Sequence, residues 1–535
     1  QQFREIYYRF THLNVPYEQL YKTKKGLIVE KNLAGDVDNL AQLLKNISGQ
    51  SRQGNDFTRL GLEKALAAIL TIFPVYRTYI NQDGLRESDR TYVKETIAKA
   101  KEQIPLLLKD LKFIETVLLL EEEETLTAEQ KEQRRHFVMK LQQLTGPLMA
   151  KGIEDTLLYV YYRLLSLNEV GGNPSQFGVS LPDFHEFNQH QQAVWPHKMN
   201  ATATHDTKRG EDVRARINVL SEIPDEWEQQ VKSWRELNSP KKVNLVNRIV
   251  PDTNDEYFFY QTLIGSFPFE GIENTDYVDR LKNYVIKAVR EAKVHTAWLR
   301  PDNDYETGFI TFVDHVLEPS KQNQFLKKFK PFWKKVAHYG ILNSLSQTLL
   351  KIASPGVPDI YQGTEFWDLS HVDPDNRRPV DFDRRIEVLR EIKKQAESDI
   401  LKLIDELIAT REDARIKLFL TARVLSARKQ YRQVFQDGDY QPLTAIGTFK
   451  DNIIAFARTY EDTTIMAIAP RFLTSLIQQD EMAIGRVWQD TKLELPQELP
   501  SVWKDAITNQ TVESNEILAI GEALKYFPCA LLISQ

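Results

Sequence analysis

The sequence predicts an α/β fold of the barrel type, interrupted by long helical segments and followed by a small all-β domain. Strand-like segments alternate with helical ones up to about residue 430, which favours an α/β core. Two blocks, 166–210 and 351–382, are rich in Asn, Gly, Pro and Asp, as expected where loops carry a site. Beyond residue 430 the pattern changes to short strands separated by turns.

Length and composition restrict the class of protein. A chain of 535 residues predicts two to four domains. A net charge of −6 without a long basic stripe disfavours nucleic acid or an anionic membrane as a partner. The single cysteine, Cys529, excludes an internal disulfide framework and fits a reducing compartment, so we expect a cytoplasmic protein. No apolar run approaches 18 residues.

Residues 17–165 are predicted to form amphipathic helices. The segments 36–47 and 60–70 place apolar residues three and four positions apart. Between the helices, Phe73–Ile80 is β-branched and aromatic, which predicts a strand. The charge run 121–135 is typical of a solvated helix face.

Residues 211–350 return to helical periodicity, and a further helical stretch runs to about 430. After it, Ile453–Arg458, Thr464–Ala469 and Ala530–Ser534 are predicted strands of the final all-β domain.

The first segment that could carry chemistry is Asn200–Gly210. Small and β-branched residues lead into His205 and Asp206, and a helix follows. In an α/β barrel such a position lies on the catalytic face. Thr207, or Glu211 and Asp212, would then stand at the start of the helix. The alternative is a helix cap and a surface ion cluster with Lys208, Arg209 and Arg214.

The second segment is Pro355–Asp381. Val357–Tyr361 predicts a short buried strand, and Gly363 permits a sharp turn after it. The string 373–381 contains Asn376 and Arg377, which fit either a turn with an ion pair or a polar fork that grips sugar hydroxyls.

A third segment, 150–172, contains Lys151 near Glu154 and Asp155, followed by Tyr159, Tyr161 and Tyr162. The charged residues fit an ordinary helix-side salt bridge. The tyrosines fit packing against a core or platforms for sugar rings.

The sequence contains no pattern that indicates a metal site or a cofactor site. His185, His190, His197 and His205 fall close together, but their spacings match neither a helical zinc pair nor a zinc finger. The sequence contains no Walker loop, no dinucleotide fingerprint and no Gly-x-Ser-x-Gly elbow. We therefore expect no metal and no cofactor.

Taken together, several strings resemble the maltooligosyltrehalose synthase family of the α-amylase clan. They occur in the family's order over roughly residues 17–430. They are Phe73–Tyr79, Met149–Thr156, Arg163–Gly172, Thr204–Arg216, Asp255–Gln261, Lys293–Trp298 and the block 354–382.

The resemblance implies the carboxy-terminal part of a (β/α)8 barrel. Strand six would be Phe73–Tyr79, strand seven would end at Asp206, and strand eight would be Val357–Tyr361. The implied domains are 1–180, a helical insertion with strand six; 181–430, strands seven and eight with an insertion at about 220–345; and 431–535, a β-sandwich.

The family converts the reducing-end α-1,4 bond of a maltooligosaccharide into an α,α-1,1 bond, with retention of configuration through two carboxylates. By resemblance, Asp206 is the third carboxylate, which stabilises the transition state, and His205 contacts the same sugar hydroxyls. Substrate contacts are also expected at Lys208, Arg209, Tyr361, Asn376 and Arg377.

The nucleophile and acid strings of the clan do not occur in this sequence, nor does an initial methionine. We therefore expect a carboxy-terminal portion that is inactive alone. The alternatives are an α-glucan hydrolase of the same clan and a non-enzymatic glucan-binding fragment. A maltooligosaccharide is the expected partner, and the oligomeric state is left open.

Overall fold

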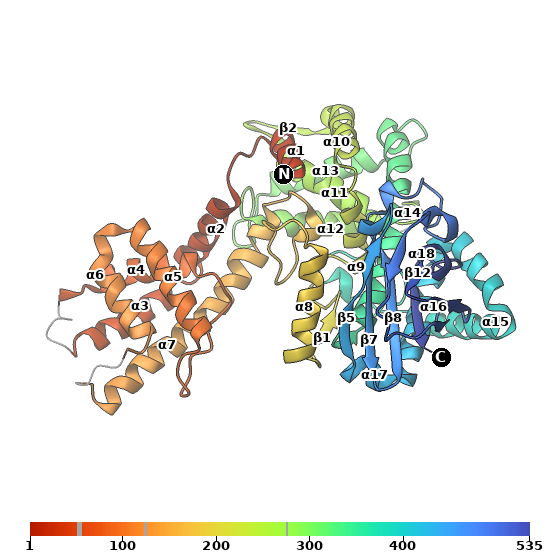
Figure 1. Cartoon of the computed structure of the whole chain (residues 1–535). Coiled ribbons are helices and arrows are strands. Elements are labelled where there is room, and N and C mark those ends of the chain that lie inside the picture. The colour runs from red at the N-terminus through yellow and green to blue at the C-terminus, as the bar shows by residue number, and fades with distance from the viewer. Residues whose placement is uncertain (51–55, 122–125, 274–275, 535) are drawn as a thin grey trace. The chain divides into compact units, whose positions relative to one another are not determined.

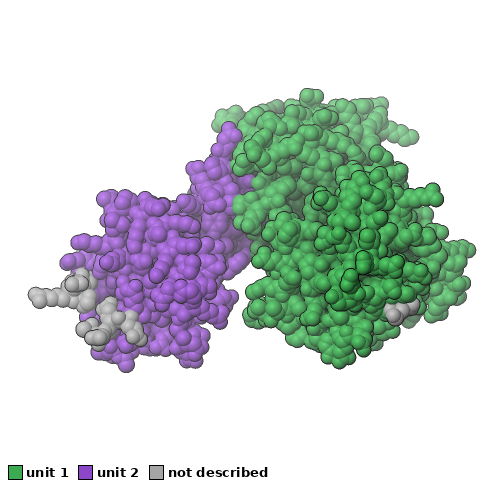
Figure 2. Space-filling view, in the orientation of Figure 1, with its two compact units in different colours: residues 1–12, 162–287, 303–535 green, residues 13–161, 288–302 purple. Residues whose placement is uncertain are grey.

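A computed structural model describes residues 1–50, 56–121, 126–273 and 276–534. The chain divides into two units, coloured separately in Figure 2. Unit 1 comprises residues 1–12, 162–287 and 303–535, and unit 2 comprises residues 13–161 and 288–302. Unit 2 therefore lies within the predicted region 1–180, apart from one short later segment.

Unit 2 is built from helices, as its periodicity predicts. They are α2 (Tyr17–Lys31), α3 (Ala34–Ser48), α4 (Arg59–Ile72), α5 (Glu87–Gln103), α6 (Leu108–Leu118) and α7 (Ala128–Met149). In α3, Val37, Leu40 and Leu44 are buried at intervals of three and four residues, and in α4 Leu62 and Leu66 repeat the pattern. These stripes meet in one core. In the predicted charge run 121–135, residues 122–125 lie outside the described residues.

The predicted strand Phe73–Ile80 is wrong, because this segment bends at Val75 and Tyr76 and none of it is a strand. Its backbone groups bond to side chains instead. The carbonyl oxygen of Phe73 accepts a hydrogen bond from Nζ of Lys25 at 2.8 Å. The side chain of Gln142 accepts from the backbone N–H of Ile80 at 2.7 Å and donates to its carbonyl oxygen at 2.9 Å. A strand needs neighbouring backbone, and here side chains of α2 and α7 satisfy the same groups.

Unit 1 contains the remaining helices. They are α1 (Gln2–Thr11), α8 (Leu181–Val194), α9 (Glu211–Val219), α10 (Pro224–Asn238), α11 (Thr253–Ser266), α13 (Asn303–Leu317), α14 (Gln324–Ala353), α15 (Phe382–Ala409), α16 (Arg415–Gln430), α17 (Arg432–Asp437) and α18 (Ile520–Ala523). Helix α12 (Tyr277–Ala292) passes from unit 1 into unit 2. An aromatic cluster around Trp227 and Trp234 packs α10 against the first turns of α14 through Phe329 and Phe332.

The end of the chain is rich in sheet, as predicted. The strands of its larger sheet, in spatial order, are β11 (Thr511–Glu513), β10 (Val502–Asp505), β13 (Ala530–Ser534), β8 (Thr463–Pro470), β7 (Ile453–Tyr460) and β5 (Asp439–Pro442). A smaller sheet has the order β12 (Ile517–Ala519), β9 (Lys492–Glu494) and β6 (Thr444–Ile446). Strands β7 and β8 form an antiparallel hairpin, drawn in blue in Figure 1.

The larger sheet packs on the helices of unit 1. Leu345 and Leu349 of α14 and Phe419 of α16 share one buried core with Phe456 and Leu531 of the sheet. This core fixes the carboxy-terminal half of α14, which leads directly into the candidate site.

Two short pairs of strands complete unit 1. An antiparallel pair joins β2 (Val243–Leu245) to β3 (Arg248–Val250). A parallel pair joins β1 (Met199–Ala201) to β4 (Val357–Asp359), with Met199 opposite Val357 and Ala201 opposite Asp359. The predicted strand at 357–361 is thus confirmed over its first three residues, although it is partly exposed rather than buried. Among the described helices, none has the length and hydropathy that a membrane span requires.

Candidate active-site loops

Parallel pairing of β1 with β4 brings two loops to one edge. Because parallel strands run in the same direction, the segments that follow Ala201 and Asp359 leave the pair on the same side. The first segment is the loop 202–210, which ends where α9 begins, and the second is the loop 360–381, which ends where α15 begins. The sequence-predicted residues of both loops are therefore neighbours in space.

A tight turn presents Asp206. Strand β1 ends at Ala201, five residues before the predicted end at Asp206, and the chain then turns between Thr204 and Thr207. The hydroxyl of Thr207 donates to the carbonyl oxygen of Thr204 at 2.9 Å. The backbone N–H of Asp206 donates to the hydroxyl of Thr204 at 3.2 Å. The side chains of His205 and Asp206 are exposed at the tip of this turn.

The second loop holds the first one in place. The side-chain amide of Asn376 donates to the carbonyl oxygens of Thr204 at 3.2 Å and His205 at 3.3 Å. Nε of Arg377 donates to the same His205 oxygen at 3.3 Å. The hydroxyl of Tyr361 donates to the carbonyl oxygen of Asn376 at 3.0 Å. The structure thus brings together four predicted binding residues next to Asp206.

Lys208 and Arg209 are buried, as Asn376 is, and Arg209 bonds to residues outside these two loops. Two guanidinium nitrogens of Arg209 donate to protein groups: Nη1 to the carbonyl oxygens of Leu165 and Asn168 at 3.2 and 3.1 Å, and Nη2 to the hydroxyl of Tyr284 at 3.1 Å. The ring of Tyr284 stacks on His371 at 4.5 Å between centroids. Burial lowers the pKa of His371 to about 3, which keeps the imidazole neutral against this aromatic ring.

A buried charge cluster lies at the base of the Asp206 loop. Glu211 and Asp212, the first two residues of α9, pair with Lys417 at 2.7 Å each, and Lys351 lies 3.4 Å from Glu211. The surface ion cluster with Lys208, Arg209 and Arg214 that the sequence offered as an alternative is not found, since Lys208 and Arg209 are buried. Burial alone would raise the pKa of Glu211, but the two ammonium groups outweigh it and hold that pKa at about 2.

Sequence reasoning missed both lysines. Lys351 and Lys417 stand about 140 and 205 positions from the carboxylates, so no local spacing connects them. The feature of the sequence that could have indicated their burial is their position in stretches otherwise rich in apolar residues. Lys351 lies in the last turn of α14, which leads into β4, and Lys417 lies in the first turn of α16.

A cavity of about 430 Å³ opens beside the second loop. Its lining includes Tyr361 and Asn376, the aromatic side chains of Phe366 and Trp367, and Asp375. Polar groups at the edges of aromatic rings are typical of pockets that bind small polar ligands. Because Asn376 both lines this cavity and bonds to the Asp206 loop, it connects the two features.

The histidines of the sequence cluster do not converge. His185 is buried and its Nδ1 lies 2.9 Å from the hydroxyl of Tyr440, whereas His190, His197 and His205 are exposed.

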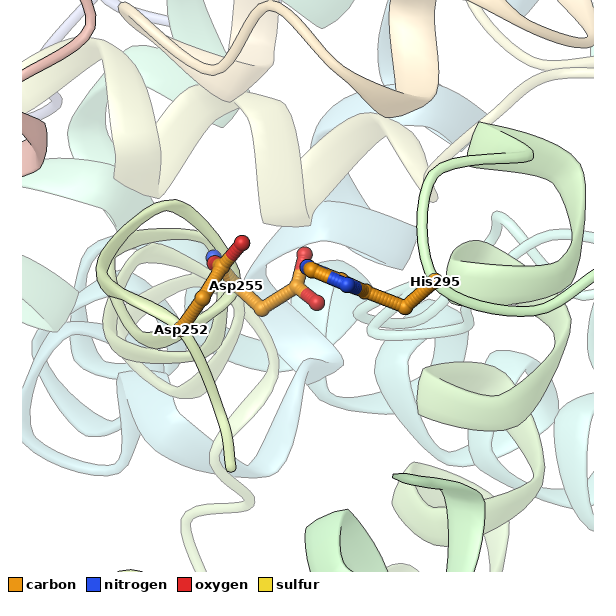
Figure 3. Close-up of side chains that lie close together, drawn as sticks. All are labelled: Asp252, Asp255 and His295. Atoms are coloured by element: carbon orange, nitrogen blue, oxygen red, sulfur yellow. The ribbon is translucent and has the colours of Figure 1, made fainter. Parts of the chain in front are cut away.

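Figure 3 shows three other side chains of metal-binding type. Asp252 caps α11 by accepting from the backbone N–H groups of Asn254 and Asp255 at 2.9 and 2.8 Å. Asp252 and Asp255 belong to unit 1 and His295 to unit 2, so the three make no single site within either unit.

The relatives found by sequence and those found by structure carry the name of one group of proteins. No protein-family model matches the chain. A Mycobacterium tuberculosis protein named as a maltooligosyl trehalose synthase is 34% identical over 380 residues, which are 70% of this chain and 43% of that protein. The chain thus spans less than half of the length of this relative.

Solved structures agree with the sequence comparison. The maltooligosyltrehalose synthase of Arthrobacter ramosus matches all of this chain and 61% of its own, with a TM-score of 0.80 and 27% identity. A hypothetical maltooligosyl trehalose synthase from Sulfolobus tokodaii matches all of this chain with a TM-score of 0.69 and 28% identity.

All three proteins carry the name of one class, the maltooligosyltrehalose synthases. The chain is homologous to the carboxy-terminal portion of the maltooligosyltrehalose synthases, which confirms the resemblance predicted from its motifs.

Proposed function

We propose that this chain supplies part of the active site of an enzyme that converts the reducing-end α-1,4 bond of a maltooligosaccharide into an α,α-1,1 bond. The observation that carries the proposal is the parallel pairing of β1 with β4, which gathers Asp206, His205, Asn376, Arg377 and Tyr361 at one edge. The names of the homologues supply the reaction. In this proposal β1 and β4 are strands seven and eight of a barrel.

Asp206 is the proposed transition-state stabiliser. Its carboxylate is exposed at the turn, where it can accept hydrogen bonds from the hydroxyls of a glucosyl ring. Those bonds strengthen as positive charge develops on the ring, because a carboxylate is most stabilising where cationic charge appears. His205, beside it, is the proposed donor to the same hydroxyls. The nucleophile and the acid of the double displacement would come from polypeptide outside the sequence of this chain.

Tyr361, Asn376 and Arg377 are proposed to shape the position of the sugar. The hydrogen bonds of Asn376 and Arg377 fix the backbone on which His205 stands. Lys208 and Arg209 were expected as substrate contacts, but both are buried. Their burial supports a different proposal, in which they stabilise the Asp206 loop by contacts with the protein interior. A rigid loop matters because the freed glucose must turn over and react again before water intervenes.

Glucan binding tests the contribution of this chain. Calorimetry with maltopentaose should show binding to the chain itself, and Asp206→Asn should weaken it. Asp462→Asn, at the exposed β7–β8 turn, is the matched control and should leave the affinity unchanged. Equal affinity in the Asp206 variant and the unchanged chain would remove Asp206 from the site.

Activity tests the reaction. A chimera would place the unmatched front portion of the Arthrobacter ramosus synthase before this chain. It should consume the reducing power of maltopentaose with little release of free glucose, and Asp206→Asn should lower kcat by about a hundredfold or more. Steady glucose release would identify a hydrolase. Glucan binding without either reaction would indicate a binding module.

A further inference from the structure

We propose that Lys417 is a positioning residue that closes the Asp206 loop at its base and fastens it to the loop that follows β4. This inference rests on the proposed function for its meaning in catalysis. The contacts that carry it are independent of that function, because they are all made within unit 1, around the almost fully buried side chains of Lys417, Glu211 and Asp212.

The ammonium group of Lys417 is saturated. It has three N–H donors, and three oxygens accept them. They are Oε1 of Glu211 at 2.7 Å, Oδ2 of Asp212 at 2.7 Å, and the carbonyl oxygen of Phe366 at 3.3 Å. A buried ammonium that is matched in this way has one geometry, since any movement leaves a donor without an acceptor in a place where water does not enter.

One end of this arrangement closes the Asp206 loop. Thr202 follows β1 directly and is the first residue of the nine-residue segment 202–210, and Glu211, which begins α9, comes directly after its last residue. The hydroxyl of Thr202 donates to Oε2 of Glu211. Lys351 also bonds to the Thr202 hydroxyl, at 2.9 Å. Glu211, held by Lys417, therefore joins the loop end to end.

The other end reaches the loop that follows β4. Asp212 accepts from the backbone N–H of Asp368 at 2.6 Å with the same oxygen that binds Lys417. The backbone N–H of Gly210 donates to the carbonyl oxygen of Ser370 at 2.9 Å. Lys417 thus lies between the segment that presents Asp206 and the segment that presents Tyr361 and Asn376, and its three hydrogen bonds go to other residues of these segments and of α9.

Loss of the ammonium should release the loop. Lys417→Met keeps the length of the side chain but leaves Glu211 and Asp212 as neighbouring buried carboxylates, which repel each other. In catalysis, a displacement of about 1 Å at a reacting group is worth roughly a hundredfold. We therefore expect kcat of the chimera to fall by one to two orders of magnitude for Lys417→Met, with KM changed much less, and Lys417→Arg to restore part of it.

Hydrogen exchange of the chain itself provides the deciding test. In Lys417→Met, the amides of Lys208 and Gly210 should exchange at least tenfold faster, while those of β7 and β8 keep their protection. Leu420→Ala, a core truncation in the same helix, is the control for general destabilisation and should not single out the loop. Glu211→Gln provides a second variant if Lys417→Met does not fold, and it should loosen the same amides.

The outcomes separate the two proposals. Unchanged exchange at Lys208 and Gly210 in a folded Lys417 variant would overturn the positioning role, whatever the chain binds. Failure of the unchanged chain and of the chimera to bind maltopentaose would overturn the proposed function, while faster loop exchange would still establish the structural link.

Discussion

The side-chain amide of Asn376 lies 3.3 Å from the carbonyl oxygen of His205 and donates a hydrogen bond to it. These residues are 171 positions apart, and the bond couples the loop after β4 to the residue that precedes Asp206. A change at Asn376 should therefore be felt at Asp206 without any change in the Asp206 side chain itself.

Asn376→Ala should weaken maltopentaose binding about tenfold, because the loop loses two side-chain hydrogen bonds. The melting temperature should change little. Calorimetry and thermal unfolding measure the two effects. Asn343→Ala is the control, since Asn343 makes the same kind of bond, to the carbonyl oxygen of Ala215, away from the loops. Equal affinities for the two variants would contradict the coupling.

Gly210→Ala should destabilise unit 1 and disturb the loop. The backbone angles of Gly210 suit any residue, so the constraint is close approach: a Cβ would lie 2.4 Å from the carbonyl oxygen of Asp368. Overpacking of this kind costs about 1–3 kcal/mol. Urea unfolding measures it. Gly35→Ala has open space in the first turn of α3 and should be neutral or slightly stabilising.

Glu211 makes the stability of the chain depend on acidity below about pH 4.5. Burial would raise its pKa, but Lys417 and Lys351 lower it to about 2 in the folded chain, against an ordinary value of 4.5. A depressed carboxyl pKa stabilises the fold above the unfolded value, and this stability is lost as the pH falls from about 4.5 toward 2. Glu211→Gln should therefore be destabilised at pH 7 by a few kcal/mol, and the difference from the unchanged chain should shrink toward pH 3. Parallel unfolding curves that keep a constant gap over this range would argue against the charge assignment.

His371 should add a second pH dependence, at higher pH. Burial lowers its pKa to about 3 from an ordinary 6.5, so the unfolded chain binds a proton at pH values where the folded chain does not. Stability conferred by the neutral ring is present above pH 6.5 and is lost as the pH falls below that value. His371→Phe keeps an aromatic ring against Tyr284 and should flatten the unfolding free energy between pH 6.5 and 4. The control is His190→Gln at an exposed position, where the curve should keep its original slope.

Local patterns account for what the sequence could predict. The periodicity of 36–47 and 60–70 predicts α3 and α4 because each stripe alone specifies a buried helix face. The strands β7, β8 and β13 are predicted because they are short runs, mostly of apolar residues, that are separated by turns. The exposed pair His205–Asp206 is likewise a local feature, since the flanking threonines make the turn.

Non-local partners account for the rest. Phe73–Ile80 has the composition of a strand, but side chains from α2 and α7 take its backbone hydrogen bonds. Lysine and arginine are usually exposed, so the sequence favours a surface position for Lys208 and Arg209. The groups that accept hydrogen bonds from the buried Arg209 stand 41 to 75 positions away in the chain. No window of sequence contains those acceptors, so their burial could be found only in three dimensions.

Helix α14 has 30 residues, and its length fixes where its last turn meets the candidate site. Phe332 lies near its start, in the aromatic cluster, and Lys351 lies in its last turn, 3.4 Å from Glu211. Each residue of a helix advances about 1.5 Å and turns about 100°. Insertion or deletion of a single residue between these points would turn Lys351 to another face of the helix and remove it from the carboxylate of Glu211. Point substitutions along α14 can be absorbed by repacking, whereas changes in its length cannot, so the length of this helix fixes the distance between the aromatic cluster and the buried charge cluster.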